Sequence, residues 1–338
     1  MKNSFLFGVI IIALAASSLI SLALGRYEID LSTLTQLLLW KALNIGTAPH
    51  DVTLLSNIVF DIRLPRILAV VLVGAALSVS GGAFQAMFVN PLVSPGILGV
   101  LAGASFGAAL GIMISKNWLG VQLLAFSFGF VAVLVALGVA KIYGRNGSQT
   151  ILLVLGGVIS SSLFSALLSV VKFVADPYNK LPTIVYWLMG SFSSVDMKMV
   201  ASVALPLLVS TVVLSLMGKY LNVLSLGDED AKALGVRVAW VRNSAILLAT
   251  LLSTLTVVVA GMIGWVGLII PHIARFLVGA DNRVLLPMCA LLGATFLIIV
   301  DTLCRTSMSI EIPIGIATSL IGIPIFVFAL RNAKKGFA

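Results

Sequence analysis

Two residues at the end of an apolar stretch, His272 and Arg275, have side chains that could do chemistry. They lie in "GMIGWVGLIIPHIARFLVGADNR", residues 261–283, after nearly thirty uncharged residues, and the chain has only 2 histidines. An imidazole at such a position can relay a proton or bind a metal ion, whereas Pro271 can end a helix. No second histidine, cysteine or carboxylate stands beside His272, so a metal-ligand set is incomplete. We therefore predict no metal site, and we expect His272 to cap or brace a break in the helix.

The sequence shows no group that would power a reaction or a transport cycle from within the chain. Gradient-driven carriers keep acids or histidines in the middle of membrane helices, where they relay ions. Here Asp301 and Glu311 stand at the ends of apolar segments, and Asp61 precedes another. The only Gly-Lys dipeptide, at residue 218, is followed by tyrosine and lacks the upstream glycine of a phosphate-binding loop. Energy must come from an ion gradient or from another subunit, and this pattern favours another subunit.

The composition predicts a helical membrane protein. Of the 338 residues, 60% are hydrophobic and 10% are charged, and the mean hydropathy is +1.17. Several apolar runs exceed the ~20 residues that a helix needs to cross the hydrocarbon layer. The net charge of +9 is spread among loops, so we interpret it as a determinant of membrane topology and expect no nucleic-acid partner. Cys289 and Cys304 lie too far apart along one apolar segment to form a disulfide.

The predicted fold is an all-α polytopic membrane protein with about ten transmembrane helices in a single domain, residues 1–338. We expect the first apolar segment to be a retained helix and not a signal peptide, because it exceeds the usual apolar core of a signal peptide. Short basic loops and the basic C-terminus favour cytoplasmic N- and C-termini. The expected crossings are 5–24, 64–88, 96–115, 119–140, 151–172, 197–217, 243–268, 272–281 (short), 285–303 and 313–330.

The polar loop at residues 218–242 contains a pattern typical of a short helix. Ser225 or Gly227 can cap its start, three acids follow in the first turn, and Gly235 can end it. The small residues Ala231, Ala233 and Gly235 would let the surface of a partner approach closely. A solvated connector is the alternative interpretation.

Serines recur at helical spacing in the fifth predicted crossing. Ser162, Ser165 and Ser169 would form one stripe on that helix. Hydroxyl side chains of this kind let helices pack closely. Alternatively they would give a transport pathway an uncharged, weakly hydrogen-bonding wall, and both interpretations can apply to different serines.

Five strings, from about residue 60 onward, are similar in order to the permease subunits of ferric-chelate and cobalamin ABC importers of type II. They are "RLPRILAVVLVGAALSVSGGAFQAMFVNPLVSPGILG", "YWLMGSFSSVD", "LSLGDEDAKALGV", "GMIGWVGLIIPHIARF" and "EIPIGIATSLIGIPIFVFAL". The resemblance implies a homodimer of ten-helix subunits in the bacterial inner membrane. It also implies two cytoplasmic ATPase subunits, which would bind ATP and Mg²⁺, and a periplasmic solute-binding protein. No cofactor is expected on this chain, which would not itself be an enzyme.

The resemblance also implies roles for particular residues of this sequence. It implies that the loop at 218–242 couples to the ATPase, and that the fifth and tenth crossings line the pathway at the dimer axis, with Ser162, Ser165 and Ser169 on the fifth. The implied ATPase-coupling residues are Gly227, Asp228, Glu229, Asp230, Ala231, Lys232, Ala233, Leu234 and Gly235. The implied cytoplasmic gate comprises Asn90, Leu92, Ser148, Gln149 and Thr150. The implied docking residues for the binding protein are Arg63, Arg66 and Arg305.

An internal repeat relates crossings 2–5 to crossings 7–10. When the sequence is aligned with itself at one constant offset, Gly81, Pro91 and Gly99 fall on Gly261, Pro271 and Gly279. The copies begin on an even and an odd crossing, so they would be inverted in the membrane. We accordingly expect "NPLVSPG" to break one helix on the inner side and "IPHIAR" to break its counterpart toward the outer side.

The expected function is import of a metal-containing solute: an iron chelate (siderophore), haem or cobalamin. The same machinery importing a small oxyanion, molybdate or tungstate, is the alternative. A gradient-driven secondary transporter is the alternative from a different class. The binding protein, which is another chain, would determine most of the specificity.

Overall fold

A computed structural model describes residues 2–44, 47, 49–115, 117–143 and 149–333, and every regular element among them is helical. Ten helices correspond to the predicted crossings, so the predicted all-α fold is confirmed. Seven spans are long and apolar enough to cross a membrane, and three of the ten helices, α5, α13 and α15, are shorter but apolar. The ten are α1 (Lys2–Ala23), α4 (Leu64–Phe88), α5 (Val100–Ile114), α6 (Trp118–Tyr143), α7 (Gln149–Val174), α9 (Met197–Leu216), α12 (Val238–Ala260), α13 (Val266–Val278), α14 (Asn282–Thr306) and α15 (Ile314–Ala333).

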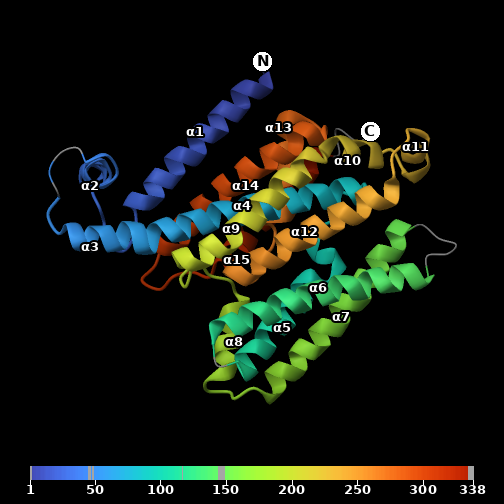
Figure 1. The fold of residues 1–338 in the computed structure, drawn as a ribbon, viewed down its shortest axis with the longest axis horizontal. Helices are drawn as coiled ribbons and strands as arrows, with labels where there is room; N and C mark the ends of the chain where they lie inside the picture. Colours follow the sequence, from blue (N-terminus) through green and yellow to red (C-terminus); the bar gives the residue numbers. More distant parts are fainter. Residues whose placement is uncertain (1, 45–46, 48, 116, 144–148, 334–338) are drawn as a thin grey trace.

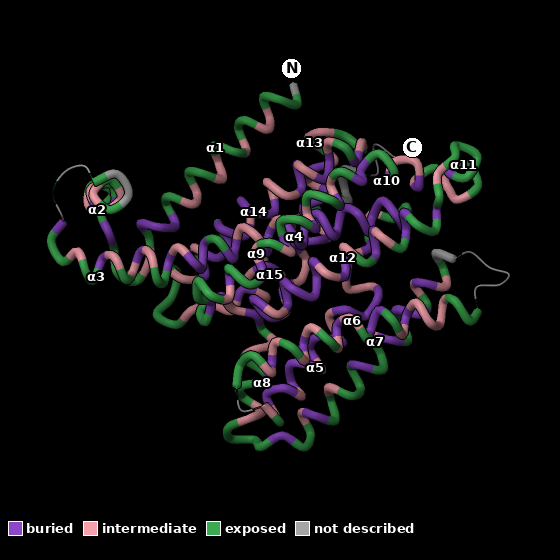
Figure 2. The backbone as a smooth tube through the Cα atoms, viewed as in Figure 1, coloured by how far each residue is buried: buried purple, intermediate pink, exposed green. Residues whose placement is uncertain are grey.

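Helix α4 forms the centre of the bundle (Figure 1) and contacts α14, α12, α9 and α13. It is buried along most of its length, whereas α1 is largely exposed (Figure 2). The burial follows from small residues, which let helices approach closely in an apolar environment. At Gly81 the approach is closest: a Cβ atom there would lie 1.8 Å from the carbonyl oxygen of Gly267 in α13.

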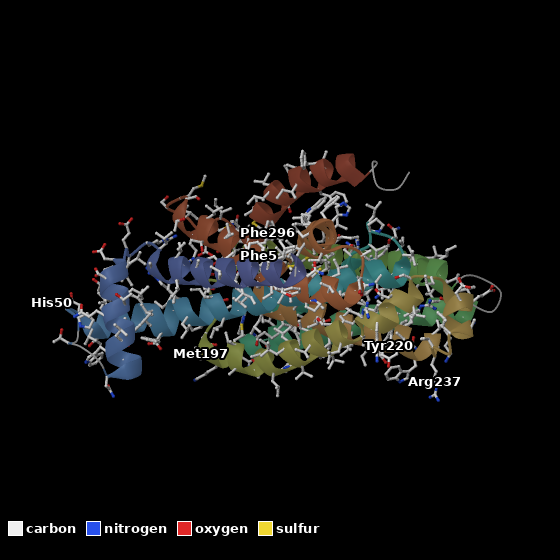
Figure 3. The ribbon with its side chains drawn as sticks, turned by 90° about the horizontal axis from the view of Figure 1, so that it is seen from above. Phe5, His50, Met197, Tyr220, Arg237 and Phe296 are labelled. Atoms are coloured by element: carbon white, nitrogen blue, oxygen red, sulfur yellow. The ribbon has the colours of Figure 1, made fainter. Side chains whose placement is uncertain are left out.

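The two ends of the bundle carry different short elements (Figure 1). Helices α10 (Gly218–Leu224) and α11 (Asp228–Ala233) lie at one end, with the start of α1. The opposite end carries α2 (Leu31–Leu43), α3 (Val52–Ser56) and α8 (Lys180–Leu188), and a π-helical segment, Asn57–Arg63, joins α3 to α4. In Figure 3, His50 lies at one end and Tyr220 and Arg237 at the other. We call these the α2 end and the α11 end.

The inverted repeat is present at the level of whole helices. Helices α4–α7 and α12–α15 follow the same order, a long helix, a short one and two further helices, and α4 and α12 run in opposite directions (Figure 1). The predicted register of the repeat is wrong, because Gly81 lies inside α4 whereas Gly261 lies beyond the end of α12. The turn after α4 spans residues 89–99 and the turn after α12 only 261–265, so one constant offset cannot align both helices.

The predicted break at "IPHIAR" is also wrong. Pro271 and His272 lie inside α13, and the chain turns before that helix begins, where Gly261 and Trp265 have φ angles of 69° and 68°. A proline inside a helix removes one backbone hydrogen bond, which membrane helices tolerate. Residues with positive φ redirect the chain instead. His272 is buried inside α13 and packs edge to face against Phe276, with the ring centres 5.2 Å apart.

Candidate functional site

The predicted short helix in the polar loop is present as α11, and glycines stand at both of its ends. Gly227 is the N-cap residue, with φ 110°, and Gly235 follows the C-cap with φ 79°. The amide of Gly235 donates to the carbonyl of Lys232 and the amide of Val236 donates to that of Ala231. This pair of bonds is a Schellman motif, which ends a helix by satisfying its last carbonyls. Both positive φ angles disfavour any residue with a Cβ atom.

One side of α11 packs on the bundle and the other faces outward. Ala231 is fully buried, whereas Lys232, Ala233 and Leu234 are exposed. The prediction that all small residues of this segment serve a partner is therefore wrong for Ala231, which contacts its own chain. The outward surface of α11 consists of Glu229, Asp230, Lys232, Ala233 and Leu234.

An ion pair fixes α11 to α12. Arg242 of α12, which is 4% exposed, donates to both carboxylate oxygens of Asp228, at 2.5 and 3.0 Å. The hydrogen bonds from Arg242 lower the pKa of the Asp228 carboxyl group. A two-pronged pair of this kind fixes direction as well as distance. The ion pair therefore fixes the orientation of the first turn of α11 relative to the bundle.

The Asp228–Arg242 pair predicts a pH-dependent loosening of α11. Because the folded-state pKa of Asp228 is depressed, the pair stabilises the fold above the unfolded pKa of about 3.9 and is lost as the pH falls through the folded value. Asp228→Asn should raise amide hydrogen exchange across residues 228–233 at pH 7. Wild-type protein should match it only when the pH falls below the folded-state pKa of Asp228, which the hydrogen bonds from Arg242 hold below the ordinary value of about 3.9. Equal exchange in both proteins at pH 7 would contradict this prediction.

The turn after α4 holds two of the predicted gate residues. Asn90 accepts a hydrogen bond through Oδ1 from the amide of Leu92, 2.9 Å away, and the side chain of Leu92 is 56% exposed. Ser225, after α10, donates to the carbonyl of Ala86 in the last turn of α4, which links the α10 segment to this turn. Gln149 and Thr150 lie in the first turn of α7, and Ser148 lies outside the described residues. Whether these residues form a gate stays a prediction.

The serines of α7 divide into two groups. Ser160 is buried and donates to the carbonyl of Ala132 in α6 at 2.7 Å, so it serves packing within the chain. The predicted stripe of Ser162, Ser165 and Ser169 is exposed. Only Ser169 of the stripe has a described hydrogen bond, to the carbonyl of Ser165 one turn earlier. The stripe is thus accessible to any molecule that lies beside α7.

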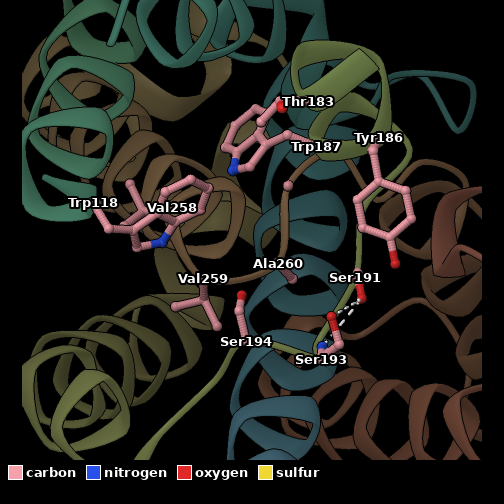
Figure 4. Close-up of a pocket in the computed structure, with 11 residues that line it drawn as sticks. Trp118, Thr183, Tyr186, Trp187, Ser191, Ser193, Ser194, Val258, Val259 and Ala260 are labelled. Carbon is pink, nitrogen blue, oxygen red and sulfur yellow. Dashed lines mark hydrogen bonds between the residues drawn. The ribbon is translucent and has the colours of Figure 1, made fainter. Parts of the chain in front are cut away.

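A cavity of about 430 Å³ lies at the α2 end, between α8 and the end of α12 (Figure 4). Its walls include Trp118, Tyr186 and Trp187. Ser191 and Ser193 form its hydroxyl rim, with their oxygens 3.0 Å apart. No pattern in the sequence indicated this cavity, although the string "YWLMGSFSSVD" contains most of its polar groups.

The predicted docking arginines at the α2 end turn inward, and two of them cap α1. Arg63 is 4% exposed and donates to the carbonyls of Leu22, Ala23 and Tyr27. Arg305 donates to the carbonyl and hydroxyl oxygens of Ser21, at 3.0 and 2.7 Å. Cations are favoured at a helix C-terminus, where the last carbonyls have no partner within the helix.

The third arginine lies in a buried cluster of charges. Arg66 is 8% exposed and donates to Asp301 at 2.7 Å and to Glu311 at 3.1 Å. The cluster joins α4, α14 and the segment before α15. The prediction that Arg63, Arg66 and Arg305 face a binding protein is therefore corrected, because their guanidinium groups bind groups of their own chain. The sequence indicated that the three arginines lie at one end of the molecule, but it did not indicate which groups they bind.

Comparisons with known proteins agree with this architecture. The model of the FecCD transport family matches residues 12–332. The molybdate import system permease protein MolB of Haemophilus influenzae is 41% identical over 98% of this chain and 96% of its own length. A probable iron chelatin transport system permease of Helicobacter pylori is 36% identical over 87% of this chain and 90% of its own. A solved metal-chelate type ABC transporter in an inward-facing conformation superposes with a TM-score of 0.85 at 38% identity, covering 97% of this chain and 99% of that one.

The family match covers both helical repeats and the α11 segment. It also covers the turn after α4, the α8 region and the second half of α1. Together with ten apolar helices in the same arrangement as a solved relative, it identifies the chain as a multi-pass membrane protein that belongs to the FecCD transport family.

Proposed function

We propose that this chain is the membrane-spanning permease subunit of an ATP-driven ABC importer and is not itself catalytic. The observation that carries the proposal is α11, a helix outside the bundle whose ends are fixed by glycines and whose direction is fixed by Arg242. Such a rigid projection suits the transmission of motion from a cytoplasmic ATPase. In this proposal the α11 end faces the cytoplasm of a bacterium and the α2 end faces the periplasm.

The chain would work as a homodimer with two ATPase subunits and a periplasmic solute-binding protein. The exposed serine stripe of α7 would face the axis between the two copies, and Asn90 and Leu92, with residues 148–150, would form the inner gate. The binding protein would dock on the α2 end through groups other than the three inward-turned arginines. The buried acid Asp301 and the partly buried acid Glu311 pair with Arg66, which supports an external energy source over an ion relay.

The proposed cargo is a metal-containing solute, and two classes have support. Relatedness to an iron chelatin permease supports a metal chelate. Greater identity, over more of the chain, to a molybdate permease supports a small oxyanion. Uptake of labelled molybdate and of a labelled ferric chelate would be measured in cells with and without this chain. Loss of one uptake identifies the class. Loss of neither contradicts both.

The coupling role predicts a specific effect of a polar group on α11. Leu234 is 63% exposed on α11, and Leu226 is 60% exposed just before it. Leu234→Asp should reduce co-purification of the ATPase by about tenfold, a loss of roughly 1.4 kcal/mol, as for one apolar side chain at an interface. Leu226→Asp is the matched control and should have a smaller effect. Equal effects of the two substitutions would count against a specific contact by α11.

A further inference from the structure

A second cavity, of about 320 Å³, lies at the α11 end, where the end of α4, α10 and the turn between α13 and α14 meet. Both apolar and polar side chains line it, and one of the polar ones is that of Arg275. Nothing in the proposed transport function uses this arginine. The lining residues are Gln85, Ala86, Val89, Asn90, Pro91, Asn222, Ser225, Arg275, Ala280 and Asn282.

The positive charge of Arg275 has no counter-charge in the part of the chain that the structure describes. Its Nη1 and Nη2 atoms each donate to Oε1 of Gln85 at 3.1 Å. None of the described ion pairs includes it. A guanidinium group has five N–H donors, so three are left without a partner among the described residues. A partly buried charge without a counter-charge is costly.

Among the neighbouring polar groups, the atoms that remain free to bind a ligand are mainly hydrogen-bond donors. Asn222 accepts hydrogen bonds from the backbone and side chain of Asn282 through its Oδ1 atom, which commits this acceptor. The Oδ1 atom of Asn90 accepts from Leu92, so its amide nitrogen is the atom that remains to donate. The nearby carboxylate of Asp281 is bonded to Arg283 and Asn222. Uncommitted donors beside an unpaired cation favour an anion.

We propose that this cavity binds an oxyanion of the phosphate type, held by the free side of Arg275 with the Asn90 amide. The planar fork of arginine pairs with two oxygens of one anion. The volume is about ten times the ~30 Å³ that one water molecule occupies in the liquid, which is ample for a tetrahedral oxyanion. The cavity lies where membrane helices end, so a lipid headgroup phosphate and a free oxyanion can both supply this chemistry.

Thermal unfolding of the full-length protein in an uncharged detergent tests the proposal. Inorganic phosphate is titrated at constant ionic strength, with chloride as the balancing ion, and phosphatidylglycerol is added in a separate series. We expect one of them to raise the melting temperature by about 2–4 °C at saturation. A response to phosphate identifies a free oxyanion as the ligand. A response to phosphatidylglycerol alone identifies a headgroup.

Variants assign the response to the cavity. Arg275→Gln should abolish it, Arg275→Lys should weaken it, and Arg237→Gln should keep it, because Arg237 is exposed at the same end but does not line the cavity. Ala280→Glu supplies a carboxylate from the exposed cavity edge and should also abolish the response, which covers the case that Arg275→Gln fails to fold. No response in wild type, or an unchanged response in Ala280→Glu and any folded Arg275→Gln protein, overturns the proposal.

Discussion

Arg66→Ala is expected to destabilise the folded protein by about 3–5 kcal/mol, because it removes the described partner of Glu311 and leaves Asp301 only its longer contact with Arg305, at 3.3 Å. The side chain of Asp301 is only 2% exposed and that of Glu311 19%. Without the guanidinium group, both carboxylates lose charge-assisted hydrogen bonds in a region with little water. The measurements are the melting temperature in detergent and the yield of monodisperse protein. The matched control is Arg283→Ala, whose exposed pair with Asp281 is worth at most about 1 kcal/mol.

The Arg66 experiment also separates the structural role from a docking role. If Arg66 serves the fold, Arg66→Met combined with Asp301→Asn and Glu311→Gln should recover part of the lost stability, because buried charge clusters can be replaced by uncharged groups of similar size. If Arg66→Ala keeps the wild-type melting temperature but loses capture of the binding protein, the assignment of Arg66 to internal packing is wrong.

Gly81→Val is the second substitution with a large expected effect. A Cβ atom at Gly81 would lie 1.8 Å from the carbonyl oxygen of Gly267, and backbone cannot move aside as a side chain can. Helices α4 and α13 would have to separate, with an expected loss of about 3 kcal/mol or more. The measurement is thermal unfolding of the purified protein in detergent.

Gly138 provides the matched control for Gly81. It is also in the interior of a membrane helix, α6, but nothing lies within 4 Å of a Cβ atom built there. Gly138→Val should therefore leave the melting temperature near the wild-type value, since β-branching alone costs a helix little. If the two variants unfold at the same temperature, close helix approach at Gly81 does not stabilise the bundle.

Most of the helices could be predicted from the sequence, because a helix must have a minimum apolar length to cross the membrane. The number of apolar segments of that length almost determines the number of helices. The short helix α11 was also predictable, since its capping glycines and acidic first turn are local signals. The turn between α12 and α13 could not be predicted from the sequence. Pro271 is the more conspicuous signal, yet Gly261 and Trp265, which look ordinary in an apolar run, make the turn.

The arginines at the α2 end could not be assigned from the sequence for a different reason. Arg66 binds Asp301 and Glu311, which follow it by 235 and 245 residues. No spacing rule relates residues so far apart, and a basic residue at a helix end has the same local pattern whether it faces water or another helix. Only the packing of α4 against α14 brings these charges together.

The capping of α1 has a consequence for biosynthesis. Of the two arginines that hold the end of α1, Arg63 follows closely in the sequence, whereas Arg305 follows Ser21 by 284 residues. The main contacts of α1 are with α14, another late segment. Arg63 can hold the end of α1 early, but α1 lacks its main packing partner until the last quarter of the protein has been translated. Truncated chains that end before α14 should leave every face of this helix accessible to crosslinking with insertion factors, and full-length chains should protect the face that contacts α14.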